Sequence, residues 1–373
     1  MFAAMCGHGV RVRMIVLHGK HPPASEMPEG FEQLTIPPDT NIFTRRKYMR
    51  EHLVAADSEP TIIHDTFVAQ MGLWLRNRWT CKHKHSNVRN VLSLYSPNPG
   101  FLLGGHWLGK KGFKIKVHEI PYYLRKEIPM ISGEMLSCHL ADAVIGNSEE
   151  IARDVQKYYM IPACRTHFVS AEIDAGYFCP GPCKRQELGL PEEEKIILYT
   201  GNFQRRKGID VLLRAFDILA RNDRHMRLIL LGKVGDTGYV WFRDLLNSLP
   251  SNSQIEMRGE VDSDTLRDYY RSCDLFLMPT YHEGSPRVVK EAMACGLAVV
   301  ASRASGNLAI DPEGKSLVYA SDWNPAEYAD LMEKVLNDSE FRQRRIEAGL
   351  TLVQKLSPEK VAQKYLELYS SLF

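Results

Sequence analysis

The 373-residue chain contains 44% hydrophobic and 25% charged residues, which is the balance of a globular protein with a sizeable core. Its length exceeds that of one ordinary core and predicts two domains. A formal net charge of +2 neither indicates nor excludes a charged partner. Eight scattered cysteines are typical of reduced thiols and not of a disulfide-rich secreted domain.

The sequence shows neither the pattern of a transmembrane helix nor that of a signal peptide. No apolar run approaches the roughly 20 residues that span a bilayer. Residues 1–9 lack the charged start and the long apolar stretch of a signal peptide. We therefore expect a cytoplasmic protein, with peripheral contact at the inner membrane face as a further reading.

The first half alternates short β-branched runs with helical patterns, which predicts a parallel sheet flanked by helices. The expected strands lie near residues 11–17, 61–64, 90–94, 114–118 and 143–146. The stretch Cys179-Pro-Gly-Pro-Cys183 then predicts a linker, so we expect an N-terminal domain over residues 1–180. A metal clip at this cysteine pair is disfavoured, because no second Cys/His pair follows at zinc spacing.

The second half shows the same alternation more clearly. Strands are expected at 195–200, 227–231, 255–258, 275–278 and 298–301, with helices at 208–222, 240–248, 264–272 and 286–295. This pattern predicts a doubly wound domain over 184–356, whose ligands bind beyond the carboxyl ends of the strands. A last amphipathic helix over 357–373 has no partner fixed by the sequence, and the N-terminal domain is one candidate.

Two strand-to-helix turns of the second half carry the candidate chemistry. The first, Gly201 to Gly208, brackets three cations with glycines at the start of a helix, where anions are favoured. The second begins with Glu283 and reaches Glu291 eight residues later. In it Ser285 is placed to cap the helix, and Pro286 suits the first helical position. Taken singly, the first turn is more often a solvated loop than a phosphate site, and the second is more often a capped helix than a ligand site.

Both turns, in this order and with these strands between them, resemble the C-terminal domain of the family 4 glycosyltransferases of the GT-B fold. The matching stretch runs from about Ile196 to Val318 and includes the segment Glu-Ala-Met-Ala-Cys-Gly that starts at Glu291. The resemblance implies an α/β fold with two Rossmann-like domains that face each other across a cleft.

The resemblance also implies a retaining sugar transfer from a nucleotide-sugar donor, with no cofactor and no metal. Lys207 and a nearby arginine, Arg206, would hold the diphosphate, Glu283 the donor sugar and Glu291 the ribose. Asn202 stands where the family usually has arginine, and Arg205 or Arg206 is the candidate replacement. The other implied donor-binding residues are Gly201, Asn202, Gly284, Ser285 and Pro286.

The first half resembles the family less closely. His118 ends an expected strand and corresponds to the family's histidine beside the donor sugar, which makes it a candidate catalytic residue with Glu283. His64 is a weaker candidate at the preceding strand end, and Ala171 replaces a usual asparagine. The family's first strand, glycine-rich loop and helix are not found, since Gly7-His-Gly-Val10 leads directly into a strand. Either the true start lies upstream or the fold has lost its first βα unit. We expect the former, because deleting a strand leaves unpaired backbone groups that are costly to bury.

Two other patterns that resemble ligand-binding motifs are interpreted as purely structural. Asp262-Ser-Asp264 has the form of a metal-binding Asp-x-Asp site, but it precedes a helix that Asp262 can cap. The glycine-rich stretch Gly232 to Gly238 lacks the dinucleotide fingerprint and its distant acidic residue.

Basic residues gather in the first half. Between Thr44 and Lys116 lie 13 Lys or Arg residues against four Asp or Glu, with Trp74, Trp79 and Trp107 among them. This composition suits an anionic membrane surface and equally suits solvated helix faces. No recognition motif accompanies the charge, so nucleic acid is not an expected partner.

We therefore expect a hexosyltransferase of cell-envelope or glycan biosynthesis, acting on a sugar, glycan, lipid-linked or small-molecule acceptor. Two alternatives remain open at the level of the sequence. One is a sugar phosphorylase or sugar-nucleotide epimerase on the same fold. The other is a non-catalytic protein that binds a nucleotide or a partner.

Overall fold

The structure is a computed structural model that describes residues 2–7, 12–16, 29–35, 61–65, 88–94, 131–223, 225–234 and 239–373. The chain folds into two compact units. The first comprises Met1–Glu172 with Pro358–Phe373, and the second comprises Ile173–Ser357. The stretch 179–183, predicted as a linker, therefore lies within the second unit. There the Arg271 guanidinium donates to the carbonyl oxygen of Cys179 at 2.7 Å.

The second unit is built on six parallel strands in the order β12-β11-β10-β7-β8-β9. Its central strands are almost fully buried, which explains why they are continuous apolar runs and not alternating ones. The five strands predicted for this half are present within one residue at each end. The strands are β7 (Lys195–Thr200), β8 (Met226–Leu231), β9 (Ile255–Gly259), β10 (Leu275–Met278), β11 (Val299–Ser302) and β12 (Leu317–Ala320).

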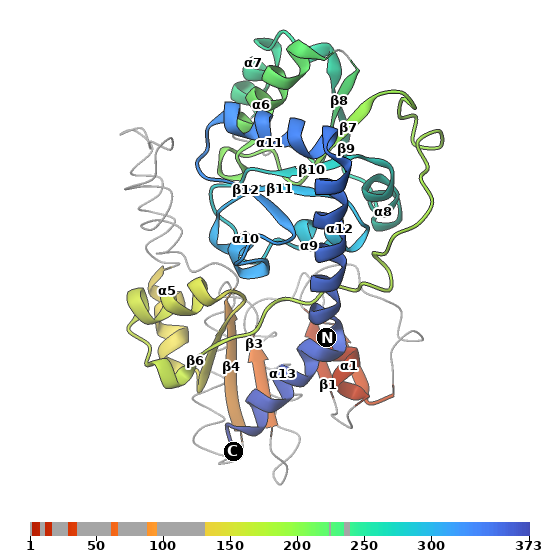
Figure 1. Ribbon diagram of the computed structural model, residues 1–373. Coiled ribbons are helices and arrows are strands. Elements are labelled where there is room, and N and C mark those ends of the chain that lie inside the picture. Colours follow the sequence, from red (N-terminus) through yellow and green to blue (C-terminus); the bar gives the residue numbers. More distant parts are fainter. Residues whose placement is uncertain are drawn as a thin grey trace. The chain divides into compact units, whose positions relative to one another are not determined.

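Helices cover both faces of this sheet (Figure 1). One layer holds α6 (Ile209–Asn222), α7 (Tyr239–Asn247) and α11 (Pro325–Asn337), and the other holds α8 (Ser263–Ser272), α9 (Arg287–Ala294) and α12 (Ser339–Val353). Asp262 caps α8 by accepting from the Thr265 amide at 2.8 Å, which confirms the capping prediction. The shorter helices are α10 (Ser305–Ile310), η6 (Arg205–Lys207), η7 (Asn252–Gln254) and η8 (Gln354–Leu356).

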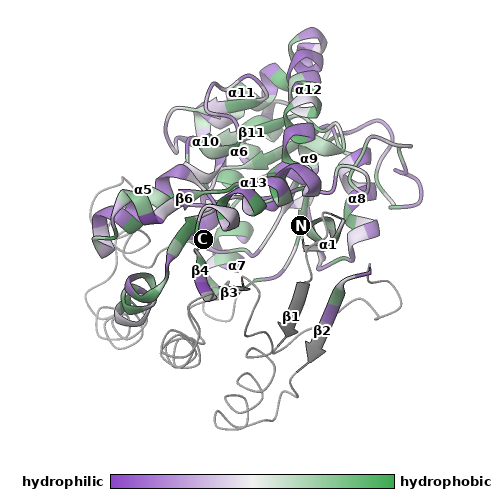
Figure 2. Ribbon diagram, turned by 90° about the horizontal axis from the view of Figure 1, so that it is seen from below, coloured by the Kyte–Doolittle hydropathy of each residue, from purple (hydrophilic) through white to green (hydrophobic). Residues whose placement is uncertain are grey.

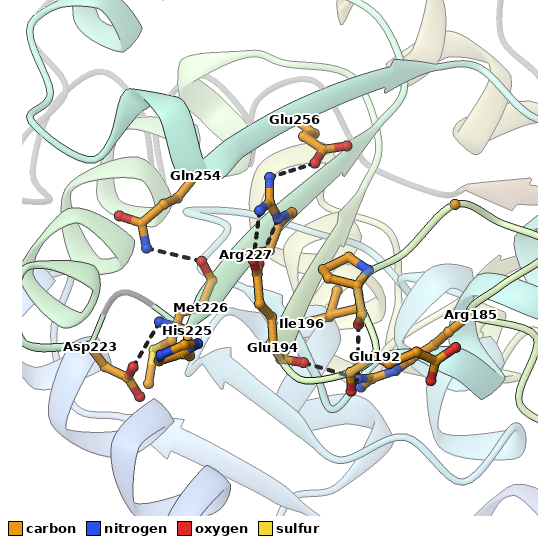
Figure 3. A network of polar contacts seen from close by, with 12 residues as sticks. Arg185, Glu192, Glu194, Ile196, Asp223, His225, Met226, Arg227, Gln254 and Glu256 are labelled. Atoms are coloured by element: carbon orange, nitrogen blue, oxygen red, sulfur yellow. Dashed lines mark hydrogen bonds and ion pairs between the residues drawn. The ribbon is translucent and has the colours of Figure 1, made fainter.

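An ionic network joins the amino ends of these strands (Figure 3). Arg227 at the start of β8 pairs with Glu194 before β7 and with Glu256 in β9, at 2.7 Å in each case. Arg185 donates to Asp274 before β10 at 2.7 Å and to the carbonyl oxygens of residues 191, 192 and 194. Ion pairs and hydrogen bonds thus hold the amino ends of these strands together.

The first unit contains the parallel sheet β3-β4-β5-β6 and a separate parallel pair, β1-β2. Strands β2 and β6 were not predicted, and the predicted strand at 114–118 lies outside the described residues. A helix over residues 131–140 and α5 pack beside β5, and α5 presents alternating hydrophilic and hydrophobic stripes (Figure 2). The elements are α1 (Phe2–Cys6), β1 (Val12–Val16), β2 (Phe31–Thr35), β3 (Thr61–Asp65), β4 (Val88–Leu94), β5 (Ala143–Gly146), α5 (Glu149–Tyr159), η5 (Ala163–Arg165) and β6 (Thr166–Phe168).

The last helix, α13 (Pro358–Ser370), completes the core of the first unit. Its apolar residues pack with Met5 of α1 and with Val91 and Ile145 of the sheet. The Tyr369 hydroxyl also lies 2.5 Å from Nδ1 of His64 in β3. Among the described residues, no helix is long and apolar enough to cross a membrane.

Candidate functional site

The carboxyl edge of the second sheet has one position where the winding reverses. Strands β7 and β10 are neighbours, yet the chain continues from β7 toward β8 and from β10 toward β11, in opposite directions. The loops 201–208 and 279–286 leave the sheet at this point. In open α/β sheets this reversal is where ligands bind, so the two loops singled out by the sequence meet at the expected place.

Glycines allow the loop after β7 to lie close to its neighbours. Gly208 has φ +69°, and a Cβ there would lie 2.0 Å from the carbonyl oxygen of Pro279 in the other loop. Gly232, with φ +128°, would likewise place a Cβ 2.1 Å from the carbonyl oxygen of Gly201. The 3-10 turn η6 carries Arg206 and Lys207 immediately before Gly208. Any side chain at Gly208 would therefore displace the segment that holds both cations.

Backbone hydrogen bonds fasten the two loops together. The carbonyl oxygen of Arg206 accepts from the Tyr281 amide at 3.0 Å. The Thr280 hydroxyl lies 3.2 Å from that oxygen and 3.1 Å from the carbonyl oxygen of His282. The Arg206 guanidinium donates to the same His282 oxygen at 3.3 Å. The cations of one loop are thus held at a fixed place against the acidic loop.

Three predicted site residues meet in one charged cluster. The Lys207 ammonium contacts Oε1 of Glu283, and Nη1 of Arg206 lies 3.9 Å from the same oxygen. The Lys207 and Glu283 side chains are 18% and 12% exposed, so the pair is largely shielded from water. Burial lowers the pKa of Lys207, while the Glu283 carboxylate raises it and the Arg206 charge lowers it. Two cations thus lie beside this carboxylate at the carboxyl edge of the sheet, a setting that favours an anionic ligand.

Helix α9 starts beside this cluster without a side-chain cap. Its N-cap is Pro286, which makes no side-chain cap hydrogen bond, and no side chain of the described residues accepts from its first-turn amides. Two local predictions are therefore wrong: Ser285 does not cap the helix, and Pro286 precedes its first residue. The Ser285 hydroxyl is occupied instead by the Lys290 ammonium, which donates to Oγ at 3.1 Å. The uncapped amides and the helix dipole remain available to an anion at this end.

Glu291 lies further along α9, in a less polar setting. It is only 6% exposed, accepts from the Tyr270 hydroxyl at 3.2 Å and lies 3.9 Å from Nε of Arg287. Burial raises the pKa of its carboxyl, and Arg287 and Tyr270 partly offset the rise. Such a shielded carboxylate is suited to accept hydrogen bonds from a ligand's hydroxyl groups.

Other residues of the site were not found from the sequence. Ser305 donates to the carbonyl oxygen of Glu283 at 3.0 Å, and a Cβ at Gly306 would lie 2.6 Å from that oxygen. Trp323 stacks on Tyr281 and donates from its indole nitrogen to the carbonyl oxygen of Thr280 at 3.1 Å. These residues follow β11 and β12, and only the parallel order of the strands brings them to the acidic loop.

The remaining predicted residues have separate settings. Asn202 is exposed, and its carbonyl oxygen accepts from the Tyr199 hydroxyl at 3.1 Å. His118 lies outside the described residues. His64 is held by the Ser93 and Tyr369 hydroxyls, and burial lowers its pKa to about 4. The described residues contain no group of three or more His, Cys, Asp or Glu side chains placed to hold a metal ion.

Comparison with known proteins gives a family match to the unit that contains these two loops. Residues 182–351, within the second unit, match the family model of the glycosyl transferases group 1. A D-inositol 3-phosphate glycosyltransferase of Thermobifida fusca is 30% identical over 248 residues, which cover 64% of this chain. The chain spans 57% of the length of that relative.

Solved structures agree with the overall fold. Sucrose-phosphate synthase from Thermosynechococcus elongatus superimposes with a TM-score of 0.76 at 20% identity, over 100% of this chain and 91% of that one. Anabaena Alr3699/HepE, solved in complex with UDP-glucose, gives a TM-score of 0.70 at 16% identity, over 91% of this chain and 86% of that one. The fold is therefore GT-B, as the sequence predicted, and its second unit matches a glycosyltransferase domain.

Proposed function

We propose that this chain is a retaining glycosyltransferase of family 4, which transfers a sugar from a nucleoside diphosphate donor bound by its second unit. The observation that carries the proposal is the meeting of Lys207, Arg206 and Glu283 at the reversal point of the sheet, beside the uncapped start of α9. The group 1 family match over the same unit supports it. We propose UDP as the donor nucleotide to test first, because HepE was solved in complex with UDP-glucose.

The Lys207–Glu283 ion pair suggests how the free site is prepared for the donor. Without ligand, each charge partly satisfies the other, which lowers the cost of keeping both away from water. When the donor binds, its diphosphate becomes the partner of Lys207 and Arg206, and the first amides of α9 add donors. Glu283 is then released to accept hydrogen bonds from the sugar hydroxyls, and Glu291 accepts from the ribose.

The same groups act in the transfer step. As the bond from the sugar to the diphosphate breaks, negative charge grows on the leaving oxygen. Lys207 and Arg206 are held by the loop contacts before reaction, so they stabilise this charge with little rearrangement. We assign the neutralisation to these side chains, without a metal ion or a cofactor. The acceptor hydroxyl attacks from the face that the diphosphate leaves, and its proton passes to the leaving phosphate oxygen, so the anomeric configuration is retained.

The acceptor is assigned to the first unit, with His118 proposed beside the donor sugar. The relatives named above act, by their names, on D-inositol 3-phosphate and form sucrose phosphate. Phosphorylated polyols and sugars are therefore the first acceptors to test, followed by lipid-linked glycans. We further propose a cytoplasmic location with peripheral contact at an anionic membrane surface.

The direct test measures release of nucleoside diphosphate from UDP- and GDP-sugars in the presence of these acceptors. Glu283→Gln should reduce turnover by at least 100-fold, because the neutral amide is a weaker acceptor for the sugar hydroxyls in the transition state. NMR of the product should show the anomeric configuration of the donor.

The matched control is Glu260→Gln. Glu260 forms an exposed ion pair with Lys233 at 3.2 Å in the same unit, so its loss should leave turnover within about twofold. Full activity of Glu283→Gln would refute the site assignment. Sugar phosphate formation that depends on inorganic phosphate would instead favour a phosphorylase.

A further inference from the structure

Lys290 carries a buried charge that the proposed mechanism does not use. It lies on α9 between Val289 and Glu291, and it has no exposed surface. Removing an ammonium group from water costs several kcal/mol, so a buried lysine needs hydrogen-bond acceptors. One acceptor is Oγ of Ser285, 3.1 Å from Nζ. The charge is thus joined to the loop that leads from Glu283 into α9.

This contact determines what the Ser285 hydroxyl can offer a ligand. A hydroxyl has one proton to donate and lone pairs that accept. An ammonium group only donates, so the Ser285 oxygen accepts from Lys290 and its own proton remains to be donated. No acceptor for that proton is found among the described residues, and the Ser285 side chain is partly exposed.

The surroundings favour an anion as the acceptor of that proton. Ser285 immediately precedes Pro286, the N-cap of α9, which makes no side-chain cap hydrogen bond to the first-turn amides. On the other side of the loop, Arg206 and Lys207 approach Glu283. The Lys290 charge adds positive potential behind the same loop, where it can favour an anion without touching it.

We propose that Lys290 is a positioning residue for diphosphate binding, which fixes the Ser285 hydroxyl as a donor and raises the positive potential at the start of α9. The proposal rests on the function proposed above and adds a residue to its donor site. Lys290 acts through Ser285 and through its charge, whereas Lys207 meets the phosphates itself. Its effect should therefore be confined to ligands that carry the diphosphate.

The test compares nucleoside diphosphates with their nucleosides by isothermal titration, using UDP, uridine, GDP and guanosine. Lys290→Met and Ser285→Ala should each lower the affinity for the nucleoside diphosphate that binds by about tenfold, since one charge-assisted donor is lost. The affinity for the corresponding nucleoside should not change. The double variant should be no more than about twofold weaker than Lys290→Met, because both changes remove one unit. Lys195→Met is the control, since Lys195 bonds Asn337 at the amino edge of the sheet.

Each outcome decides between explanations. An equal loss of affinity for the nucleoside diphosphate and for the nucleoside would show a general structural role and overturn the proposal. Wild-type affinity of Ser285→Ala would overturn it as well, and this variant decides the matter if Lys290→Met does not fold. If the wild type binds neither UDP nor GDP, the proposed donor site itself fails. If it binds one of them and Lys290→Met binds it equally well, only the role of Lys290 fails.

Discussion

Gly208→Ala tests whether the two loops of the donor site must lie as close as the structure places them. Gly208 has φ +69°, and an alanine in this region costs about 1–2 kcal/mol. Its Cβ would also lie 2.0 Å from the carbonyl oxygen of Pro279, a backbone atom that only a loop movement can relieve. Such overpacking costs about 1–3 kcal/mol more. We expect a total loss of about 2–5 kcal/mol in the free energy of unfolding.

Gly259→Ala provides a matched control for this measurement. Gly259 has a similar φ of +75°, but nothing lies within 4 Å of the position its Cβ would take. Gly259→Ala should lower the free energy of unfolding only by the conformational penalty of about 1–2 kcal/mol. Both free energies can be measured by urea denaturation at 25 °C.

The nucleotide affinity gives a second measure of the same perturbation. Arg206 and Lys207 directly precede Gly208, so movement of the loop should also displace both cations. Gly208→Ala should therefore bind nucleoside diphosphates at least tenfold more weakly, and Gly259→Ala should bind as the wild type does. Equal stability and equal affinity of the two variants would refute the argument that this close approach holds the site.

Three further predictions concern charges elsewhere in the two units. Burial raises the pKa of Glu291, so the free energy of unfolding falls as pH rises from 4.5 through the folded-state pKa. Glu291→Gln should therefore raise the melting temperature at pH 7, and an unchanged melting temperature would contradict this. The pKa of His64 is lowered from 6.5 to about 4, so the unfolded chain takes up a proton first as pH falls. The free energy of unfolding should therefore drop by on the order of 3 kcal/mol between pH 6.5 and pH 4. His64→Gln should remove that slope in urea denaturation at several pH values, and an unaltered slope would count against the assignment. Arg185→Met removes one donor from Asp274, which keeps the Ile196 amide, and removes the donor to four carbonyl oxygens, those of residues 191, 192, 194 and 272. It should cost about 2–4 kcal/mol by the same method, whereas a loss below about 0.5 kcal/mol would show that the network is dispensable.

The fold of the second unit could be predicted because its strands are buried on both faces. Runs such as Lys195–Thr200 and Leu275–Met278 contain almost only apolar residues, and glycine or polar turns end them. The first unit gave weaker signals. Strand β2, Phe31–Thr35, mixes polar and apolar residues, and β6 has only three residues, so neither stands out from a loop.

The candidate site could be predicted only as far as its two loops. Both follow neighbouring parallel strands, so the meeting of Lys207 with Glu283 follows from the topology. The supporting contacts do not follow from local sequence. A serine before a proline resembles a helix cap, and only the folded chain shows that Ser285 is engaged by Lys290. A single lysine in an amphipathic helix likewise gives no sign that it is buried.

Titration of nucleoside diphosphates into the wild type and Lys207→Ala tests the central claim most directly. A ligand present at 100 times its dissociation constant stabilises the folded state by about 2.7 kcal/mol, which a thermal-shift screen detects readily. We predict that UDP or another nucleoside diphosphate stabilises the wild type and Lys195→Ala, whose lysine lies at the amino edge, but not Lys207→Ala. Equal stabilisation of the wild type and Lys207→Ala would contradict the assignment of the donor site to the reversal point of the second sheet.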